Sequence, residues 1–148
     1  MTKIDFYIAP EKAQESTAAS HHVVACRIIE KAVRRDMSVY LHVEDEQEAV
    51  TMDDLLWTFR PNAFIPHERR DASSIEKADD RIVLIGHGEP GNCRPDLLVN
   101  LSSRLPTFFA RYLRLAEIVS SENGAKIKSR ERWKHYKERG YPLAVHNL

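Results

Sequence analysis

The sequence has few cysteines, and their placement argues against two kinds of protein. Cys26 and Cys93 are the two cysteines among 148 residues, and they do not form the CxxC pairs that bind zinc. One possible disulfide is not the framework that holds small secreted domains together. We expect Cys26, which lies in an apolar helical pattern, to be a small buried residue.

Long apolar runs, internal repeats and an excess of one charge are also absent. No run approaches the roughly 20 apolar residues of a membrane span, and the segment MTKIDFYIAPEKAQ lacks the apolar core of a signal peptide. The 22 basic and 22 acidic residues balance, which argues against a general binder of polyanions. We therefore expect one cytoplasmic domain over residues 1–148, with no membrane partner.

Known catalytic and metal-binding motifs are missing as well. The chain has no HExxH and no GxSxG, although it contains seven histidines. Four of them could supply an acid, a base or a ligand in a pocket: His21, His22, His67 and His87. We interpret each as a surface or hydrogen-bonded structural residue, with His21 and His22 at the exposed start of a helix. The acidic stretch Glu44 to Glu48 could bind a metal, but a helix dipole favours carboxylates there without one. We predict no catalytic residue, cofactor or metal.

Strand-like and helix-like segments alternate along the chain. Apolar runs predict strands at residues 4–9, 38–43, 81–86 and 96–101, and a last strand near residues 115–119. Apolar residues three and four apart predict helices from Ser16 to about Arg35 and from Asp45 to Phe59, with Asp45 as the N-cap. We also expect a helix at residues 106–113 and a basic helix near the end. This order favours an α/β domain with a mostly parallel sheet flanked by helices.

The turn GHGEPG, from Gly86 to Gly91, follows a predicted strand. Parallel sheets bind ligands at the carboxyl ends of their strands, so this turn is the obvious candidate for a phosphate loop. It lacks the GxGxxG spacing and the GKS or GKT ending, and Pro90 prevents a helix from continuing. We favour a plain turn. The alternative is an independent nucleotide-binding protein or enzyme that uses this loop with nearby histidines.

Positive charge is concentrated near the carboxyl end. Residues 126–139 hold seven basic and two acidic residues, a net charge of +5, so the rest of the chain carries −5. In a helix, which turns by about 100° per residue, one face would hold Lys126, Arg130, Trp133, Lys134 and Lys137. Beside it, a less polar stripe would seat the helix on the sheet: Ala125, Ser129, Trp133 and Tyr136.

This face fits a partner that has an acidic part and an apolar anchor, because Trp133 lies among lysines and arginines. A solvated helix with no partner is an equal alternative on composition alone. Direct binding of single-stranded DNA is less favoured, since one basic stripe on an otherwise acidic molecule would bind weakly and depend strongly on salt.

A second stretch, DDLLWTFRPNAFIPH from Asp53 to His67, carries two aromatic residues near a proline-containing turn. We expect Trp57 and Phe64 on connecting backbone near the surface. If both are exposed they form an apolar patch of the kind that marks protein interfaces. The alternative is that both cap the core.

These two stretches, together with DFY near the amino terminus and EDEQEA before the second helix, resemble one family. RERWKHYKERGYPL and DDLLWTFRPNAFIPH are similar to motifs of the chi subunit of the bacterial DNA polymerase III holoenzyme. The resemblance covers nearly the whole chain. It implies a single Rossmann-like domain without nucleotide binding, and a non-catalytic accessory subunit of the clamp-loader complex.

The resemblance also implies two partner surfaces. One binds the acidic carboxyl-terminal tail of the single-stranded-DNA-binding protein, which ends in proline and phenylalanine, so that DNA is reached only indirectly. Lys126, Arg130 and Lys134 would meet the carboxylates of the tail, and Trp133 with Val119 would hold its last phenylalanine. The other surface binds the small psi subunit or a helicase of the repair type, through Trp57, Phe64, Pro66 and His67.

Overall fold

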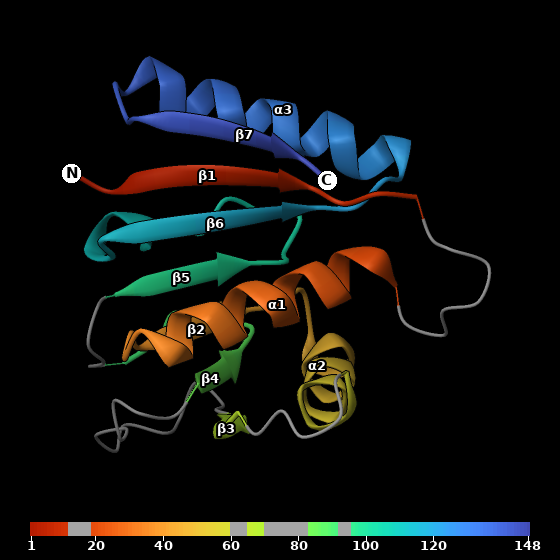
Figure 1. Cartoon of the computed structure of the whole chain (residues 1–148). Coiled ribbons are helices and arrows are strands. Elements are labelled where there is room, and N and C mark those ends of the chain that lie inside the picture. The colour runs from red at the N-terminus through yellow and green to blue at the C-terminus, as the bar shows by residue number, and fades with distance from the viewer. Residues whose placement is uncertain (12–18, 60–64, 70–82, 92–95) are drawn as a thin grey trace.

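The chain folds around a parallel β-sheet. The computed structural model describes residues 1–11, 19–59, 65–69, 83–91 and 96–148, and these include seven strands in the order β3-β4-β2-β5-β6-β1-β7 (Figure 1). Every pairing among them is parallel. The strands are β1 (Lys3–Ile8), β2 (Val39–His42), β3 (His67–Arg69), β4 (Val83–Gly86), β5 (Leu97–Asn100), β6 (Arg114–Val119) and β7 (Leu143–Asn147).

Helices cover both faces of the sheet, which explains why its central strands are apolar throughout. All residues of β2, β4 and β5 are buried, as expected of parallel strands with a layer on each side. The helices α1 (Ser20–Arg34) and α2 (Glu46–Thr58) pack on the face that contains Leu41 and Val99. The opposite face, with Leu98 and Leu115, is covered by α3 (Asn123–Glu138) and a short 3-10 helix, η1 (Phe109–Arg111). The predicted α/β fold with a parallel sheet is confirmed.

Local signals placed most elements correctly. Asp45 caps α2 as predicted, because its carboxylate accepts a hydrogen bond from the Glu48 backbone N–H at 2.9 Å. Cys26 is completely buried, and burial raises the pKa of its thiol to about 12. Phe64 and Cys93 lie outside the described residues. No helix in the described part of the chain is long and apolar enough to cross a bilayer.

Three expectations were wrong or incomplete. The helix expected at residues 106–113 is one turn of 3-10 helix, because the backbone is already extended at Tyr112, with ψ at 150°, and the helix cannot continue. Phe108, Phe109 and Tyr112 are all buried around this turn. The strand near residues 115–119 is not the last one. After α3, Gly140 adopts a positive φ of 80° and the chain returns as β7 beside β1. The edge strand β3 was also missed, since three polar residues show no alternation.

Candidate functional site

A buried ion pair fixes α3 on the sheet. Glu117 of β6 is completely buried, and Arg132 of α3 is 6% exposed. Arg132 Nε lies 3.1 Å from Glu117 Oε2, and Arg132 also donates to the Ser103 carbonyl at 2.8 Å. The Tyr136 hydroxyl donates to Glu117 Oε2 at 2.7 Å, and Asn100 Nδ2 donates to Oε1 at 2.8 Å. Every oxygen of the buried carboxylate therefore has a donor.

Burial and the pairing partners shift the pKa values of the groups in this network. Burial raises the pKa of Glu117, while the Arg132 guanidinium and the Tyr136 hydroxyl act in the opposite direction. The pKa of Tyr136 is also raised, by burial and then by the Glu117 carboxylate. Arg132 belongs to the basic segment at residues 126–139, but its guanidinium is paired with the Glu117 carboxylate inside the protein. The network thus orients α3, and the outward charge comes from other residues of the helix.

The outer side of α3 forms a groove against the edge of the sheet, which we name the α3 groove. It encloses about 390 Å³ and is lined by Phe6, Ile8, Lys126, Ser129, Arg130, Trp133, Val145 and Asn147. The ring of Trp133 meets the ring of Phe6 edge to face, with centroids 5.2 Å apart. Trp133 and Lys126 are half-buried, whereas Arg130 is exposed. The groove combines an apolar floor with a basic rim.

The structure brings together three of the five residues expected at a tail-binding site. Lys126, Arg130 and Trp133 line the α3 groove. Lys134 is exposed outside the groove lining, with its ammonium 4.0 Å from Glu138 Oε1. Val119 is 1% exposed and belongs to the core beneath α3.

Sequence reasoning missed half of the groove lining. Phe6 and Ile8 come from β1, and Val145 and Asn147 come from β7, which was not predicted. The alternation of apolar residues in β1 was the available signal for Phe6 and Ile8, since they share a face of the strand. Nothing local marks Val145, because its position depends on pairing with β1 across the whole length of the chain.

The second expected surface centres on Trp57 in the last turn of α2. Trp57 is 52% exposed, and its ring lies 4.7 Å from the ring of His67. The His67 side chain is completely buried: Nδ1 lies 2.6 Å from the Ile65 carbonyl oxygen and Nε2 lies 2.9 Å from Asp53 Oδ1. His67 therefore supports Trp57 from behind. Pro66, which directly precedes β3, is half-buried.

The turn from Gly86 to Gly91 is built as a connection. The Gly88 carbonyl accepts a hydrogen bond from the Tyr40 hydroxyl at 2.6 Å, and Glu89 pairs with Arg111. A Cβ added at Gly88 or Gly91 would meet nothing within 4 Å, so no close backbone approach requires glycine there. His87 Nε2 lies 3.3 Å from Glu46 Oε2. Within residues 83–91, this geometry fits a turn better than a cradle of N–H groups for phosphate.

Comparison with known proteins agrees with the motifs. A family described as DNA polymerase III chi subunit, HolC, matches residues 1–144. A DNA polymerase III subunit chi from Pseudomonas aeruginosa is 40% identical over 148 residues, covering 100% of this chain and 98% of that relative. The subunits chi from Haemophilus influenzae and Escherichia coli are 27% and 23% identical and cover 84% and 97% of this chain, and 85% and 96% of their own lengths. The chain therefore belongs to the DNA polymerase III chi subunit family, whose members are accessory subunits of the replicase.

Proposed function

We propose that this chain links the replicase to the single-stranded-DNA-binding protein by holding that protein's acidic carboxyl-terminal tail in the α3 groove. The observation that carries the proposal is the meeting of Arg130 and Lys126 with Trp133 in one groove over an apolar floor. A terminal phenylalanine supplies both a ring and a carboxylate. The ring would pack against Trp133 and Phe6, while the guanidinium of Arg130 would hold the carboxylate with two hydrogen bonds.

The two remaining residues of the expected set contribute in other ways. Lys134 would attract the aspartates of the tail from outside the groove, and an exposed ammonium gives little affinity at that range in salt. Val119 would act from beneath, by packing under α3, because almost none of its surface reaches solvent. Arg130 should therefore contribute more to binding than Lys134, although both are cationic and lie on the same helix.

Fluorescence anisotropy of a labelled tail peptide tests this proposal. Arg130→Ala should weaken the peptide by about ten-fold to a hundred-fold, because hydrogen bonds to charged groups contribute about 1.5–3 kcal/mol each. Lys134→Ala is the matched control and should weaken it less. A peptide that lacks the final phenylalanine should lose most of its affinity for the wild-type chain. Equal losses in the two variants, or full affinity of the shortened peptide, would contradict the proposal.

We infer that the surface around Trp57, with Pro66, the expected Phe64 and the buried His67 that contacts Trp57, binds the psi subunit or a repair-type helicase and joins the chain to the clamp-loader complex. An exposed tryptophan held from behind by a buried histidine supports this, since rigid aromatic anchors dominate many interfaces. Trp57→Ala and Phe64→Ala should each abolish capture of the partner and leave tail binding intact. Val50→Ala is the control, because Val50 is also exposed on α2, at 40%. Capture by both aromatic variants at the wild-type level would refute the inference.

We also propose that the chain has no catalysis of its own and reaches DNA only through its partners, in the bacterial cytoplasm. The alternative is a nucleotide-binding protein or enzyme that uses the Gly86–Gly91 turn, where a Cβ added at Gly88 or Gly91 would meet nothing within 4 Å. Isothermal titration with nucleotides separates the two proposals. Saturable binding that is lost in Gly88→Ala would favour the alternative, and no saturable binding is the result that we expect.

A further inference from the structure

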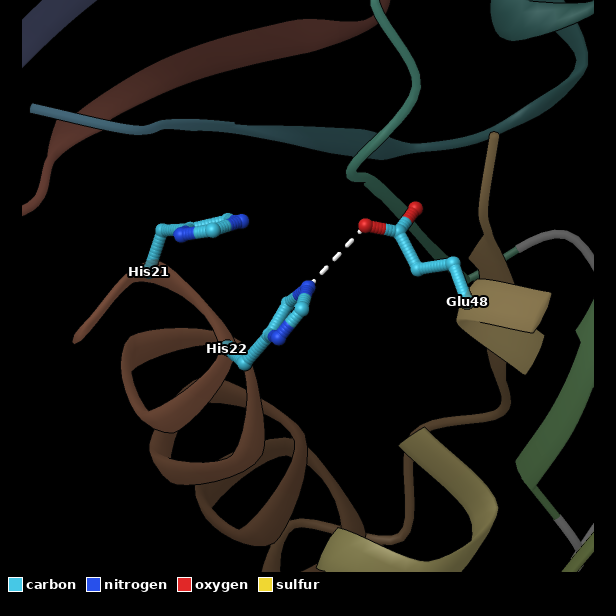
Figure 2. Close-up of side chains that lie close together, drawn as sticks. All are labelled: His21, His22 and Glu48. Atoms are coloured by element: carbon cyan, nitrogen blue, oxygen red, sulfur yellow. Dashed lines mark hydrogen bonds and ion pairs between the residues drawn. The ribbon is translucent and has the colours of Figure 1, made fainter. Parts of the chain in front are cut away.

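Two histidines and one glutamate meet beside the carboxyl ends of the parallel strands. His21 and His22 lie in the first turn of α1, and Glu48 lies in the first turn of α2. The strands that precede these helices, β1 and β2, are parallel members of one sheet, so both helices begin near the carboxyl ends of the strands. Figure 2 shows the two imidazoles of α1 and the carboxylate of α2 directed toward a common space.

The distances among these groups are short. His22 Nε2 lies 3.0 Å from Glu48 Oε2, and the rings of His21 and His22 have centroids 4.1 Å apart. One nitrogen from each histidine and one oxygen from Glu48 all lie within 4.8 Å of one another. His21 and His22 were expected at an exposed helix start, and this is wrong, because His21 is half-buried and the His22 side chain is 14% exposed. The contact of His22 with Glu48 agrees with the expectation of a hydrogen-bonded histidine.

The carboxylate is oriented by the backbone. Glu48 Oε1 accepts a hydrogen bond from the Glu44 backbone N–H at 2.8 Å, and the Glu48 N–H donates to the Asp45 cap at 2.9 Å. These contacts fix the side chain of Glu48 so that Oε2 faces the histidines. Outer contacts of this kind orient the ligands of metal sites and raise affinity.

The local charges also permit a cation. A cavity of about 220 Å³ beside the cluster is lined by His21, by the carboxyl-bearing residues Glu44, Glu48 and Glu122, and by Lys128 and Arg132. Arg132 is already neutralised by Glu117. Glu44 is likewise paired with Arg104, whose Nε lies 3.8 Å from Glu44 Oε1, so Glu48 and Glu122 are the carboxylates that oppose the positive ends of the two helix dipoles.

We propose that His21, His22 and Glu48 bind a divalent transition-metal ion of the zinc class. Two imidazole nitrogens and one carboxylate oxygen are a ligand set that zinc uses, with water or another ligand at the fourth position. Two of the three residues, His21 and Glu48, line the cavity, which has room for such a ligand. Zinc holds its nitrogen and oxygen ligands at about 2.0–2.2 Å, so small side-chain rotations would bring the three atoms onto one ion. Magnesium and calcium prefer oxygen ligands and would bind poorly.

A bound ion would join the amino end of α1 to the amino end of α2. Among the described residues, the His22–Glu48 hydrogen bond links the first turns of the two helices. Because a metal that binds the folded chain stabilises it by mass action, zinc should raise the melting temperature. This proposal is independent of the tail-binding proposal, since none of the three residues lines the α3 groove.

Isothermal titration of the full chain with ZnCl₂, after treatment with a chelator, tests the site. The wild-type chain should bind one zinc ion, and His21→Gln, His22→Gln and Glu48→Gln should each lose more than about ten-fold in affinity. His146→Gln is the matched control, because His146 is an exposed histidine beside a carboxylate, 3.0 Å from Asp5 Oδ1, and it should bind zinc as the wild type does. MgCl₂ should give no saturable heat.

Two further measurements keep the outcome clear. Cobalt(II) should produce the visible absorption of a site with nitrogen ligands in the wild type and not in His22→Gln. Melting curves without metal should show each variant folded, and zinc should raise the melting temperature of the wild type and of His146→Gln alone. The proposal is overturned if zinc shows no saturable binding, or if His22→Gln binds it as tightly as the wild type, which would leave the His22–Glu48 contact as a simple helix joint.

Discussion

Arg130 and Arg132 lie two residues apart on α3, and the structure gives them opposite surroundings. Arg130 is exposed and lines the α3 groove, whereas Arg132 is 6% exposed and pairs with Glu117 at 3.1 Å. A helix turns by about 200° over two residues, so neighbouring arginines of this spacing face the partner and the core respectively. A count of basic residues therefore combines two kinds of charge, one available to a partner and one required by the fold.

The largest effect should come from breaking the inner pair. Arg132→Ala should lower the free energy of unfolding by about 3–5 kcal/mol, because it leaves the Glu117 carboxylate buried without its counter-ion. Arg130→Ala should change it by no more than about 0.5 kcal/mol, as is usual for an exposed side chain. Urea denaturation of both variants measures the difference. Similar stability of the two variants would show that the inner pair does not hold α3.

Replacing both inner partners should restore much of that loss. In the double variant Glu117→Gln with Arg132→Met, no charge stays buried, and the glutamine can still bond with Tyr136 and Asn100. Buried ion pairs replaced by uncharged groups of similar volume are often about as stable as the original. We therefore expect the double variant to recover about half or more of the stability lost in Arg132→Ala. A double variant no more stable than the single one would mean that the pair itself, rather than an uncompensated charge, sets the cost.

The inner and outer arginines also show how far local sequence signals reach. The Asp45 cap, the apolar strands and the helical spacing of α1 depend on neighbours in the sequence, and each was predicted. The burial of Arg132 depends on Glu117 and Ser103, which α3 reaches only once the sheet has formed. The same holds for Val145 in the α3 groove and for Glu48 beside His21. Each of these placements depends on how the strands and helices are arranged in space. The periodicity within one segment does not contain that information.

A smaller difference between the two arginines should appear in how the effects of their substitution depend on salt. The screening length falls from about 10 Å at 0.1 M salt to about 3 Å at 1 M, and screening acts mainly on exposed charges. The affinity lost in Arg130→Ala, measured with the tail peptide by anisotropy, should shrink as salt rises. The stability lost in Arg132→Ala, measured by urea denaturation, should stay constant over the same series. Parallel changes of the two losses with salt would erase the distinction between an exposed and a buried charge.

The smallest expected effect concerns pH and the far end of the inner network. His42 of β2 is buried, and its Nδ1 lies 3.0 Å from Oδ1 of Asn100, whose amide donates to Glu117. Burial lowers the pKa of His42; the Asn100 hydrogen bond and Glu44 act against this shift, and Arg104 and His87 add to it. A lowered pKa means that the unfolded chain binds more protons than the folded chain just below the ordinary value of about 6.5.

The stability linked to His42 is therefore fully present above that ordinary value and is lost as the pH falls through the lowered pKa of the folded state. His42→Asn keeps a donor for Asn100 and has no group that takes up a proton in this range. Urea denaturation at neutral and at mildly acidic pH should show a smaller loss of stability in His42→Asn than in the wild type. An equal loss in both proteins would mean that the acid sensitivity arises elsewhere, outside the network that holds Arg132 and the inner face of α3.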